Sequence, residues 1–257
     1  MPNVGGQKGN SGGMPLIEWT PPPVWMTVLA VDAMYFHAAK KALKRAVVAT
    51  KTIDKAEMRV ARHQGRIDRL NQQYEEGEIH DSAHYDKLEP LAIQMESLEY
   101  DVGAAYGPFL QHLATVHVFA AAALEAHVNI RAQELLAGRM LDFFDRLSLD
   151  AKWLFLPRLR ALPGFDPGAQ PFQGFDRLIR TRNRLVHYRV QREPWRGSAV
   201  PPDFLADLGL SLKAAEGSLT TVREMAKELA RQLDDREPWW LDAENPSYFE
   251  IEQERSP

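Results

Sequence analysis

The segment PFQGFDRLIRTRNRLVHYRV, residues 171–190, is strongly charged and yet keeps apolar residues at helical spacing. An amphipathic helix of this kind buries its apolar stripe against neighbouring helices. We therefore predict a helix over residues 171–190 that packs into a helical bundle. With about 100° of rotation per residue, the stripe consists of Phe175, Leu178, Ile179, Leu185, Val186 and Val190.

Helical spacing also dominates the rest of the chain, and alternating strand patterns are nearly absent. Gly103, Gly107 and Pro108 interrupt one long pattern, and Pro suits the first turn of a new helix. The expected fold class is all-α, an antiparallel helical bundle with a long N-terminal helical hairpin extension. Besides residues 171–190, the predicted helices cover residues 24–74, 83–100, 108–136, 149–162 and 211–233.

The composition changes along the chain and predicts four regions. Ser148 is the expected N-cap of the helix over 149–162. In the C-terminal region, residues 237–257, Trp239 and Trp240 are expected to dock onto the bundle or to bind a partner protein. The four regions are a flexible Gly/Pro-rich leader (1–23), a charged hairpin extension (24–104), the helical bundle (105–236) and an acidic aromatic tail (237–257).

The overall composition limits the classes of protein that fit. The chain has 257 residues, 45% of them hydrophobic, which is ample for a packed core, and a net charge of −4 that argues against indiscriminate coating of nucleic acid. The absence of Cys excludes disulfides, Cys-ligated zinc and thiol catalysis. Without a secretory signal or a long apolar run, we expect a cytoplasmic protein that does not span a membrane.

Common cofactor and metal motifs are absent from the sequence. No GxxxxGK[S/T], GxGxxG or GxSxG segment occurs, which removes support for nucleotide hydrolases, dehydrogenases and serine hydrolases. His112, His117 and His127 lack the i, i+4 spacing of a helical metal site, and no Glu-x-x-His repeat of a di-iron bundle is present. We therefore expect neither a cofactor nor a metal.

Positive charge is concentrated in residues 176–196, which contain seven arginines and only two acidic residues, Asp176 and Glu193. Guanidinium groups suit phosphate, and a His that titrates near neutrality suits acid/base chemistry on a phosphodiester. Such arginines are also commonly a solvated face or a set of ion pairs, so both interpretations stay open. The seven are Arg177, Arg180, Arg182, Arg184, Arg189, Arg192 and Arg196.

Three blocks of sequence share one order along the chain. Ala123–Asn129 and Ser148–Pro157 precede an Arg-x4-His motif, in which Arg182 and Asn183 are followed by His187. Together they resemble the HEPN superfamily, helical-bundle proteins with an Arg-x4-6-His signature, many of which are metal-independent endoribonucleases. The resemblance covers about residues 108–190.

This resemblance implies cleavage of RNA without metal, by a homodimer, in prokaryotic stress or defence. The 2′-hydroxyl attacks the adjacent phosphorus and leaves a 2′,3′-cyclic phosphate, so DNA is not cut. His187 would move a proton, Arg182 would stabilise charge on the phosphate, and Asn183 would orient the substrate or His187. Substrate phosphates are expected at Arg180, Arg184 and Arg189.

Helical geometry separates the two principal motif residues. Arg180, Asn183 and His187 share a flank beside the apolar stripe. Arg182 projects from within the stripe, about 140° from His187, so we expect a carboxylate partner, and Glu125 on the facing Ala-rich helix is the best candidate. One monomer presents Arg182 and His187 awkwardly, whereas the dimer that the resemblance implies would bring two motifs into one cleft.

Two other functions stay open at this point. A non-catalytic bundle of the same kind would bind RNA, a nucleotide or a protein partner, and the motif would merely hold Arg182. A structural helical adaptor would use the charged hairpin over residues 51–100. Taken alone, a histidine such as His187 is more often structural than catalytic, and Glu125 is expected to pair with an arginine rather than to act as a general base.

Overall fold

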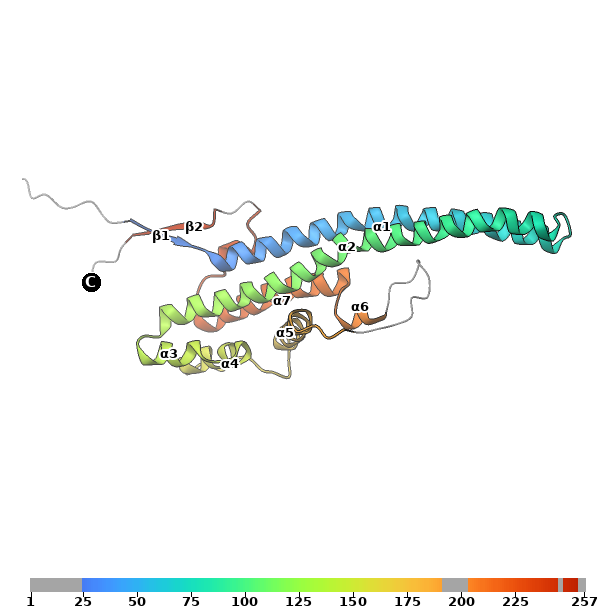
Figure 1. The fold of residues 1–257 in the computed structure, drawn as a ribbon. Helices are drawn as coiled ribbons and strands as arrows, with labels where there is room; N and C mark the ends of the chain where they lie inside the picture. Colours follow the sequence, from blue (N-terminus) through green and yellow to red (C-terminus); the bar gives the residue numbers. More distant parts are fainter. Residues whose placement is uncertain (1–24, 191–202, 245–246, 254–257) are drawn as a thin grey trace, which may run out of the picture. The chain divides into compact units, whose positions relative to one another are not determined.

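The computed structural model describes residues 25–190, 203–244 and 247–253, which are mainly helical (Figure 1). The predicted all-α bundle with a long helical hairpin is confirmed. In chain order the elements are β1 (Trp25–Leu29), α1 (Val31–Glu75), α2 (Asp81–Leu135), α3 (Arg139–Asp145), α4 (Leu149–Leu159), α5 (Phe172–Val186), α6 (Asp203–Asp207), α7 (Leu212–Leu233), the 3-10 helix η1 (Trp239–Leu241) and β2 (Phe249–Gln253).

The chain forms two compact units. In one unit, strands β1 and β2 pair antiparallel, with Trp25 opposite Gln253 and Leu29 opposite Phe249. The other unit, residues 30–248, contains the helices. The prediction of a helix from residue 24 is therefore wrong over its first turns, because residues 25–29 pair with a strand at the far end of the chain. Local hydrophobic spacing carries no sign of such a distant partner.

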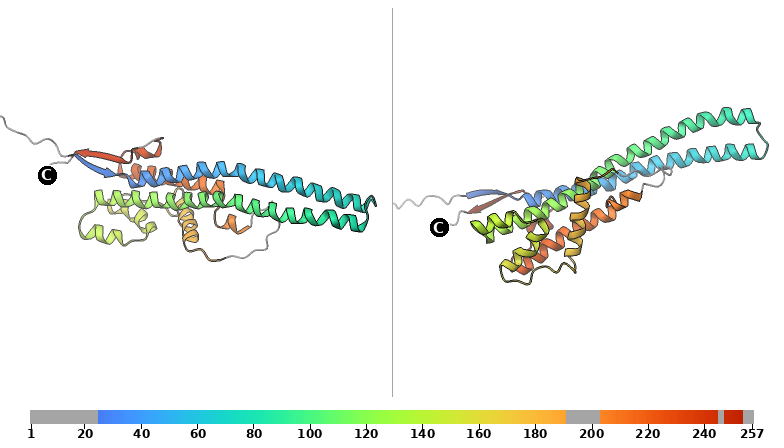
Figure 2. Two further views of the ribbon diagram at one scale, coloured as in Figure 1. Left: turned by 45° about the horizontal axis from the view of Figure 1, so that its top comes forward. Right: turned by 60° about the horizontal axis from the view of Figure 1, so that its bottom comes forward.

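Helices α1 and α2 form an antiparallel hairpin, whose far half extends past the other helices (Figures 1 and 2). With 45 and 55 residues at about 1.5 Å each, they are about 68 and 83 Å long. Gly77, in the connecting turn, has a φ of 74°, a left-handed conformation that favours glycine. Ala39, Ala42 and Ala46 are buried on α1, and such small side chains let neighbouring helices approach closely.

Helix α2 continues through the residues where the sequence predicted a break. Pro90 and Pro108 both lie inside it, although an interior proline typically costs about 3 kcal/mol. Packing compensates for this cost, because Val102 and Leu113, on either side of Pro108, are completely buried. The boundary expected between residues 104 and 105 thus falls inside α2, and the hairpin and the bundle share the same helices.

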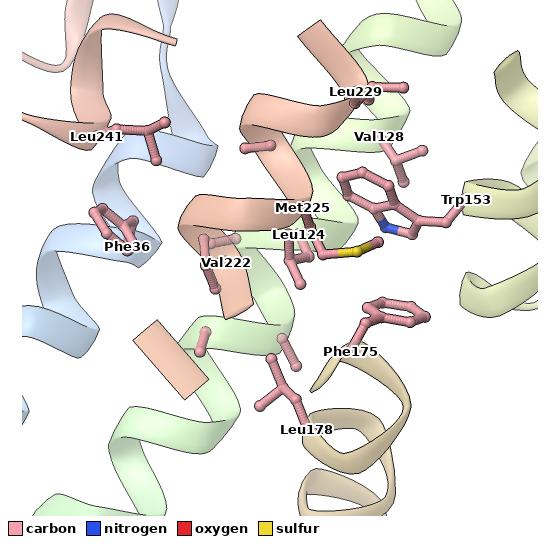
Figure 3. Close-up of a cluster of buried hydrophobic side chains, with 14 of the residues drawn as sticks. Phe36, Leu124, Val128, Trp153, Phe175, Leu178, Val222, Met225, Leu229 and Leu241 are labelled. Carbon is pink, nitrogen blue, oxygen red and sulfur yellow. The ribbon is translucent and has the colours of Figure 1, made fainter. Parts of the chain in front are cut away.

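The main hydrophobic core lies among α2, α4, α5 and α7, with additional side chains from α1 and η1 (Figure 3). Trp153 of α4 is completely buried, and its ring lies 6.0 Å from that of Phe175 on α5. Helix α7 packs on α2 and adds Val222, Met225 and Leu229. The bundle therefore fixes α5 through the side chains at its N-terminal end.

Two helices start where the sequence predicted, α4 after the predicted N-cap Ser148 and α7 within one residue of its predicted start at 211. Helix α4 begins after Ser148, and α7 begins after Ser211, whose hydroxyl accepts a hydrogen bond from the Ala214 N–H at 3.2 Å. Helix α4 ends at Leu159, three residues before the predicted end at 162. The Ser211 hydroxyl thus satisfies one of the donors that the first turn of α7 leaves unpaired, whereas the Ser148 side chain makes no capping hydrogen bond.

A buried polar network attaches the C-terminal aromatic segment to the bundle. The Asp32 carboxylate accepts hydrogen bonds from His127 Nδ1 at 2.9 Å and from Trp240 Nε1 at 3.0 Å. His37 Nε2 donates to the Trp240 carbonyl at 3.0 Å. The predicted docking of the tail is confirmed for Trp240, which is 2% exposed, whereas Trp239 is 43% exposed.

Candidate active site

Helix α5 carries the Arg-x4-His motif, and its N-terminal half is anchored in the core. Phe172, Phe175 and Leu178 are buried against α2, α4 and α7. Gly174 crosses α7 so closely that a Cβ in its place would lie 2.6 Å from Thr221 Oγ1. The anchored half thus depends on both apolar packing and one glycine at the helix crossing.

The C-terminal half of α5 leaves the core earlier than the sequence predicted. The helix ends at Val186 with His187 as its C-cap, whereas the prediction extended it to Val190. Val186 and Val190 are 55% and 77% exposed, so they do not continue the buried stripe. Helical stability in proteins comes mostly from packing, and no described element covers these two residues.

His187 lies in a groove of about 650 Å³, which we call the His187 groove. Its imidazole is exposed, and the backbone N–H of His187 donates to the Asn183 carbonyl at 2.9 Å. A ligand therefore has access to the ring. The groove is lined by Asn183, Arg184, His187, Tyr188, Arg189, Asp207 and Leu208.

Arg182 lies on a different side of α5 and forms the predicted ion pair. Its Nη2 is 3.6 Å from Glu125 Oε2 on α2, and the two side chains are 32% and 45% exposed. Its Nη1 donates to Asn183 Oδ1 at 2.9 Å. Arg182 does not line the His187 groove, but Asn183 does. Asn183 therefore lies in the groove with His187 and accepts a hydrogen bond from Arg182.

The other predicted substrate-binding arginines divide between two surfaces. Arg184 and Arg189 line the His187 groove, and Arg184 Nη1 also donates to the Asp207 carbonyl at 2.7 Å. Arg180 lines the neighbouring cavity instead and pairs with Asp176 one turn earlier. The structure thus brings Asn183, Arg184, His187 and Arg189 together in the groove, whereas Arg180 lines only the neighbouring cavity, which it shares with Arg184.

Sequence reasoning missed the opposite wall of the groove. Asp207 and Leu208 belong to α6 and the turn after it, and the sequence analysis predicted no helix there. Five residues span little more than one turn, so hydrophobic periodicity gives no signal for such an element. The hydrogen bond between Arg184 and Asp207 holds this wall against α5.

The described residues contain no metal-binding cluster and one long helix with an apolar stretch. Residues 25–190, 203–244 and 247–253 contain no group of three or more His, Cys, Asp or Glu residues that could hold a metal ion. Helix α2 contains an 18-residue window apolar enough to cross a membrane, and half of that window is buried inside the protein. A core helix of a soluble protein passes the same test.

Comparisons of the chain with protein-family models, with curated proteins and with solved structures found no match.

Proposed function

We propose that the protein is a metal-independent endoribonuclease of the HEPN type. The observation that carries the proposal is the His187 groove, in which an exposed imidazole lies beside Asn183, Arg184 and Arg189. Imidazole can transfer protons near neutral pH, and guanidinium groups bind phosphate oxygens through several N–H donors. The groove therefore combines the two chemical groups that metal-free cleavage of RNA needs.

In the proposed reaction, the ribose O2′ forms a bond to phosphorus and the P–O5′ bond breaks. The 2′-hydroxyl loses its proton, and the departing O5′ gains one, which leaves a 2′,3′-cyclic phosphate and a 5′-hydroxyl. His187 moves a proton at one of these oxygens, a role worth about 10²- to 10⁴-fold in rate. DNA lacks the attacking hydroxyl and is not a substrate.

The reaction moves two protons, whereas His187 is the only imidazole among the described residues that line the groove. We propose that a second copy of the chain supplies the other proton-transfer group in a homodimer. This assembly is the one that the HEPN resemblance implies. It would also bring Arg182 of one copy toward the substrate held by the other.

The arginines and Asn183 bind and orient the phosphate in this proposal. Arg184 uses Nη1 for the Asp207 carbonyl, and its remaining N–H groups are donors for phosphate. Arg182 donates to Asn183 Oδ1, which leaves the amide NH₂ of Asn183 for a phosphate oxygen or for His187. Glu125 holds Arg182 in position. A role in prokaryotic stress or defence rests on the resemblance alone.

The direct test is cleavage of a labelled RNA by purified protein in excess EDTA, with DNA of the same sequence as a second substrate. We expect RNA products with cyclic phosphate ends, and loss of cleavage in both His187→Ala and Arg182→Ala. Matched controls are His80→Ala and Arg236→Ala, which remove the same groups at exposed positions outside the groove. Cleavage that survives His187→Ala, or that requires a divalent metal, contradicts the proposal.

A second function is favoured by the position of Arg182. Because Glu125 and Asn183 occupy its guanidinium, and because Arg182 does not line the groove, the same surface would suit a module that binds RNA, a nucleotide or a protein without cutting RNA. Binding of intact RNA that is lost in Arg184→Gln and Arg189→Gln supports this alternative. Absence of any RNA interaction supports an adaptor that uses the α1–α2 hairpin.

A further inference from the structure

A second cavity adjoins the His187 groove on the side of α7. It has a volume of about 550 Å³, lies between α5, α6 and the first turns of α7, and shares Arg184 and Asp207 with the groove. We call it the α5–α7 cavity. The groove and the cavity therefore form adjoining depressions along one side of α5, from His187 to Arg177.

The α5–α7 cavity is strongly basic. Four cationic side chains line it, and Asp207 is the one carboxylate among its described lining residues. Within the described part of the chain, Arg177 and Lys213 make no hydrogen bond or ion pair, and both are exposed. They are free to bind an anion without breaking an existing interaction. The four cations are Arg177, Arg180, Arg184 and Lys213.

Neutral hydrogen-bonding groups and a glycine complete the lining of the cavity. The hydroxyl-bearing side chains Thr181, Ser211 and Thr221 contribute to its wall. A Cβ added at Gly217 would meet no atom within 4 Å, so the cavity is open at this point. Hydroxyl groups can donate to phosphate oxygens, and they add no competing charge.

A buried histidine supports the wall of this cavity. His117 is 1% exposed, and its Nε2 donates to the Gly209 carbonyl at 2.9 Å, while its Nδ1 lies 2.9 Å from Ser218 Oγ. Burial lowers the pKa of His117, so its ring stays neutral near neutral pH. Gly209 has a φ of 71° and joins α6 to α7. His117 therefore fixes the segment between Asp207 and Lys213 without adding charge.

On the other side of Arg177, the residues that line the surface change from mainly basic to mainly acidic. A third cavity, which we call the acidic cavity, shares Arg177 and Thr221 with the α5–α7 cavity. Two of its cations are already paired, Lys227 with Glu237 and Arg231 with Glu228. An anionic chain that follows α5 would meet repulsion there. The carboxylates of the acidic cavity are Glu224, Glu228, Asp234, Asp235 and Glu237.

We propose that the α5–α7 cavity is a second phosphate-binding site, which holds the backbone of single-stranded RNA next to the phosphodiester bound in the His187 groove. The inference rests on the proposed function and extends it from one scissile phosphate to a bound strand. Arg177 and His187 are ten residues apart, about 15 Å along a helix axis. The strand follows α5 over this distance and ends where the acidic cavity begins.

The test measures binding of a short fluorescein-labelled single-stranded RNA by fluorescence anisotropy, in a His187→Ala background that prevents cleavage. The variant Arg177→Gln/Lys213→Gln removes the two unpaired cations. Each phosphate contact contributes about 0.7 to the slope of log K against log salt concentration, so loss of two contacts lowers the slope by about 1.4. With equal affinities at 1 M salt, this difference in slope makes the variant bind RNA about 25-fold more weakly than the His187→Ala background at 0.1 M salt.

The matched control is Lys51→Gln/Lys55→Gln, which changes the net charge equally at exposed positions of the hairpin. Thermal unfolding of both double variants checks that they are folded. Inorganic phosphate and ATP serve as competitors. A site for free phosphate or nucleotide would be blocked by these competitors as effectively as by unlabelled RNA, and that result overturns the RNA assignment.

The two proposals fail in different ways. If the cavity variant binds RNA with the affinity and salt slope of the hairpin control, the second site is refuted, and cleavage in EDTA can still stand. If RNA binding depends on Arg177 and Lys213 but the wild-type protein cuts no RNA, the site stands and the enzyme is refuted. If the wild-type protein binds no RNA, both proposals are refuted.

Discussion

The two halves of helix α5 differ in burial and in the polarity of the side chains that they present. In the first half, Phe172, Phe175 and Leu178 are buried among α2, α4 and α7. In the second half, Asn183 and His187 are exposed, and the helix ends at Val186. One continuous helix thus holds a rigid anchor at one end and presents polar groups to solvent at the other.

This difference indicates how the candidate site is held in place. Side chains in a close-packed core have little freedom to move, so the anchored half fixes the direction of the exposed half. The exposed half then needs few stabilising contacts of its own, and its exposed residues Asn183 and His187 are accessible to a ligand. Substitutions in the two halves should therefore separate stability from activity.

The largest expected effect is on activity, in the exposed half. We expect His187→Ala to lower the rate of RNA cleavage by about 10²- to 10⁴-fold, because it removes the proton-transfer group. The free energy of unfolding should change by no more than about 0.5 kcal/mol, as for most exposed positions. Single-turnover cleavage and urea denaturation measure the two quantities. A large loss of stability would mean that His187 is structural.

In the anchored half, we expect the opposite result from Phe175→Ala. Removal of a completely buried ring should lower the free energy of unfolding by about 3–5 kcal/mol, since it leaves a cavity in the core. Val186→Ala, on the exposed half of the same helix, is the comparison, with an expected change within about 0.5 kcal/mol. Equal losses in the two variants would contradict the division of α5 into two halves.

A smaller effect is expected from pH, through the buried histidine behind the α5–α7 cavity. Burial lowers the pKa of His117 below its ordinary value of 6.5. Between 6.5 and the lower pKa of the folded state, the unfolded chain binds a proton that the folded protein does not. The free energy of unfolding therefore falls on acidification, by up to about 1.4 kcal/mol per pH unit for this group.

Urea denaturation from pH 7 to pH 5 measures this dependence. Because His117→Asn removes the titrating group, we expect the free energy of unfolding of this variant to depend less on pH. This expectation holds whatever the stability of the variant at pH 7. His37, whose pKa burial also lowers, continues to titrate in the variant and accounts for part of the remaining slope. An unchanged profile would show that His117 does not carry the effect.

The smallest effect is expected where α5 contacts α2 through the Arg182–Glu125 pair. The two side chains are partly exposed and their charged atoms are 3.6 Å apart, so Glu125→Gln should change the free energy of unfolding by only about 0.2–1 kcal/mol. If Glu125 only positions Arg182, the rate of RNA cleavage should fall much less in Glu125→Gln than in Arg182→Ala. Equal losses of cleavage would instead assign Glu125 a direct part in the reaction.

Much of the fold could be predicted from residues near each other in the sequence. The expected cap at Ser148 indicated the start of α4, and amphipathic spacing indicated the start of α7, because both signals act within a few residues. Pro108 was misleading, since packing between α1 and α2 outweighs its local cost. The strand over residues 25–29 could not be predicted, because its partner lies at the opposite end of the chain.

For the candidate site, the sequence by itself determined the motif residues and the Arg182–Glu125 ion pair, since helical periodicity fixes the angle at which each side chain leaves α5. Only the tertiary structure decided that α5 ends at Val186, that Asp207 and Leu208 close the His187 groove, and that Arg180 lines a separate cavity. The physical reason is the range of the interactions. Periodicity and capping act within a few turns of one helix, whereas the end of α5 and the walls of its cavities depend on where α6 and α7 pack against it.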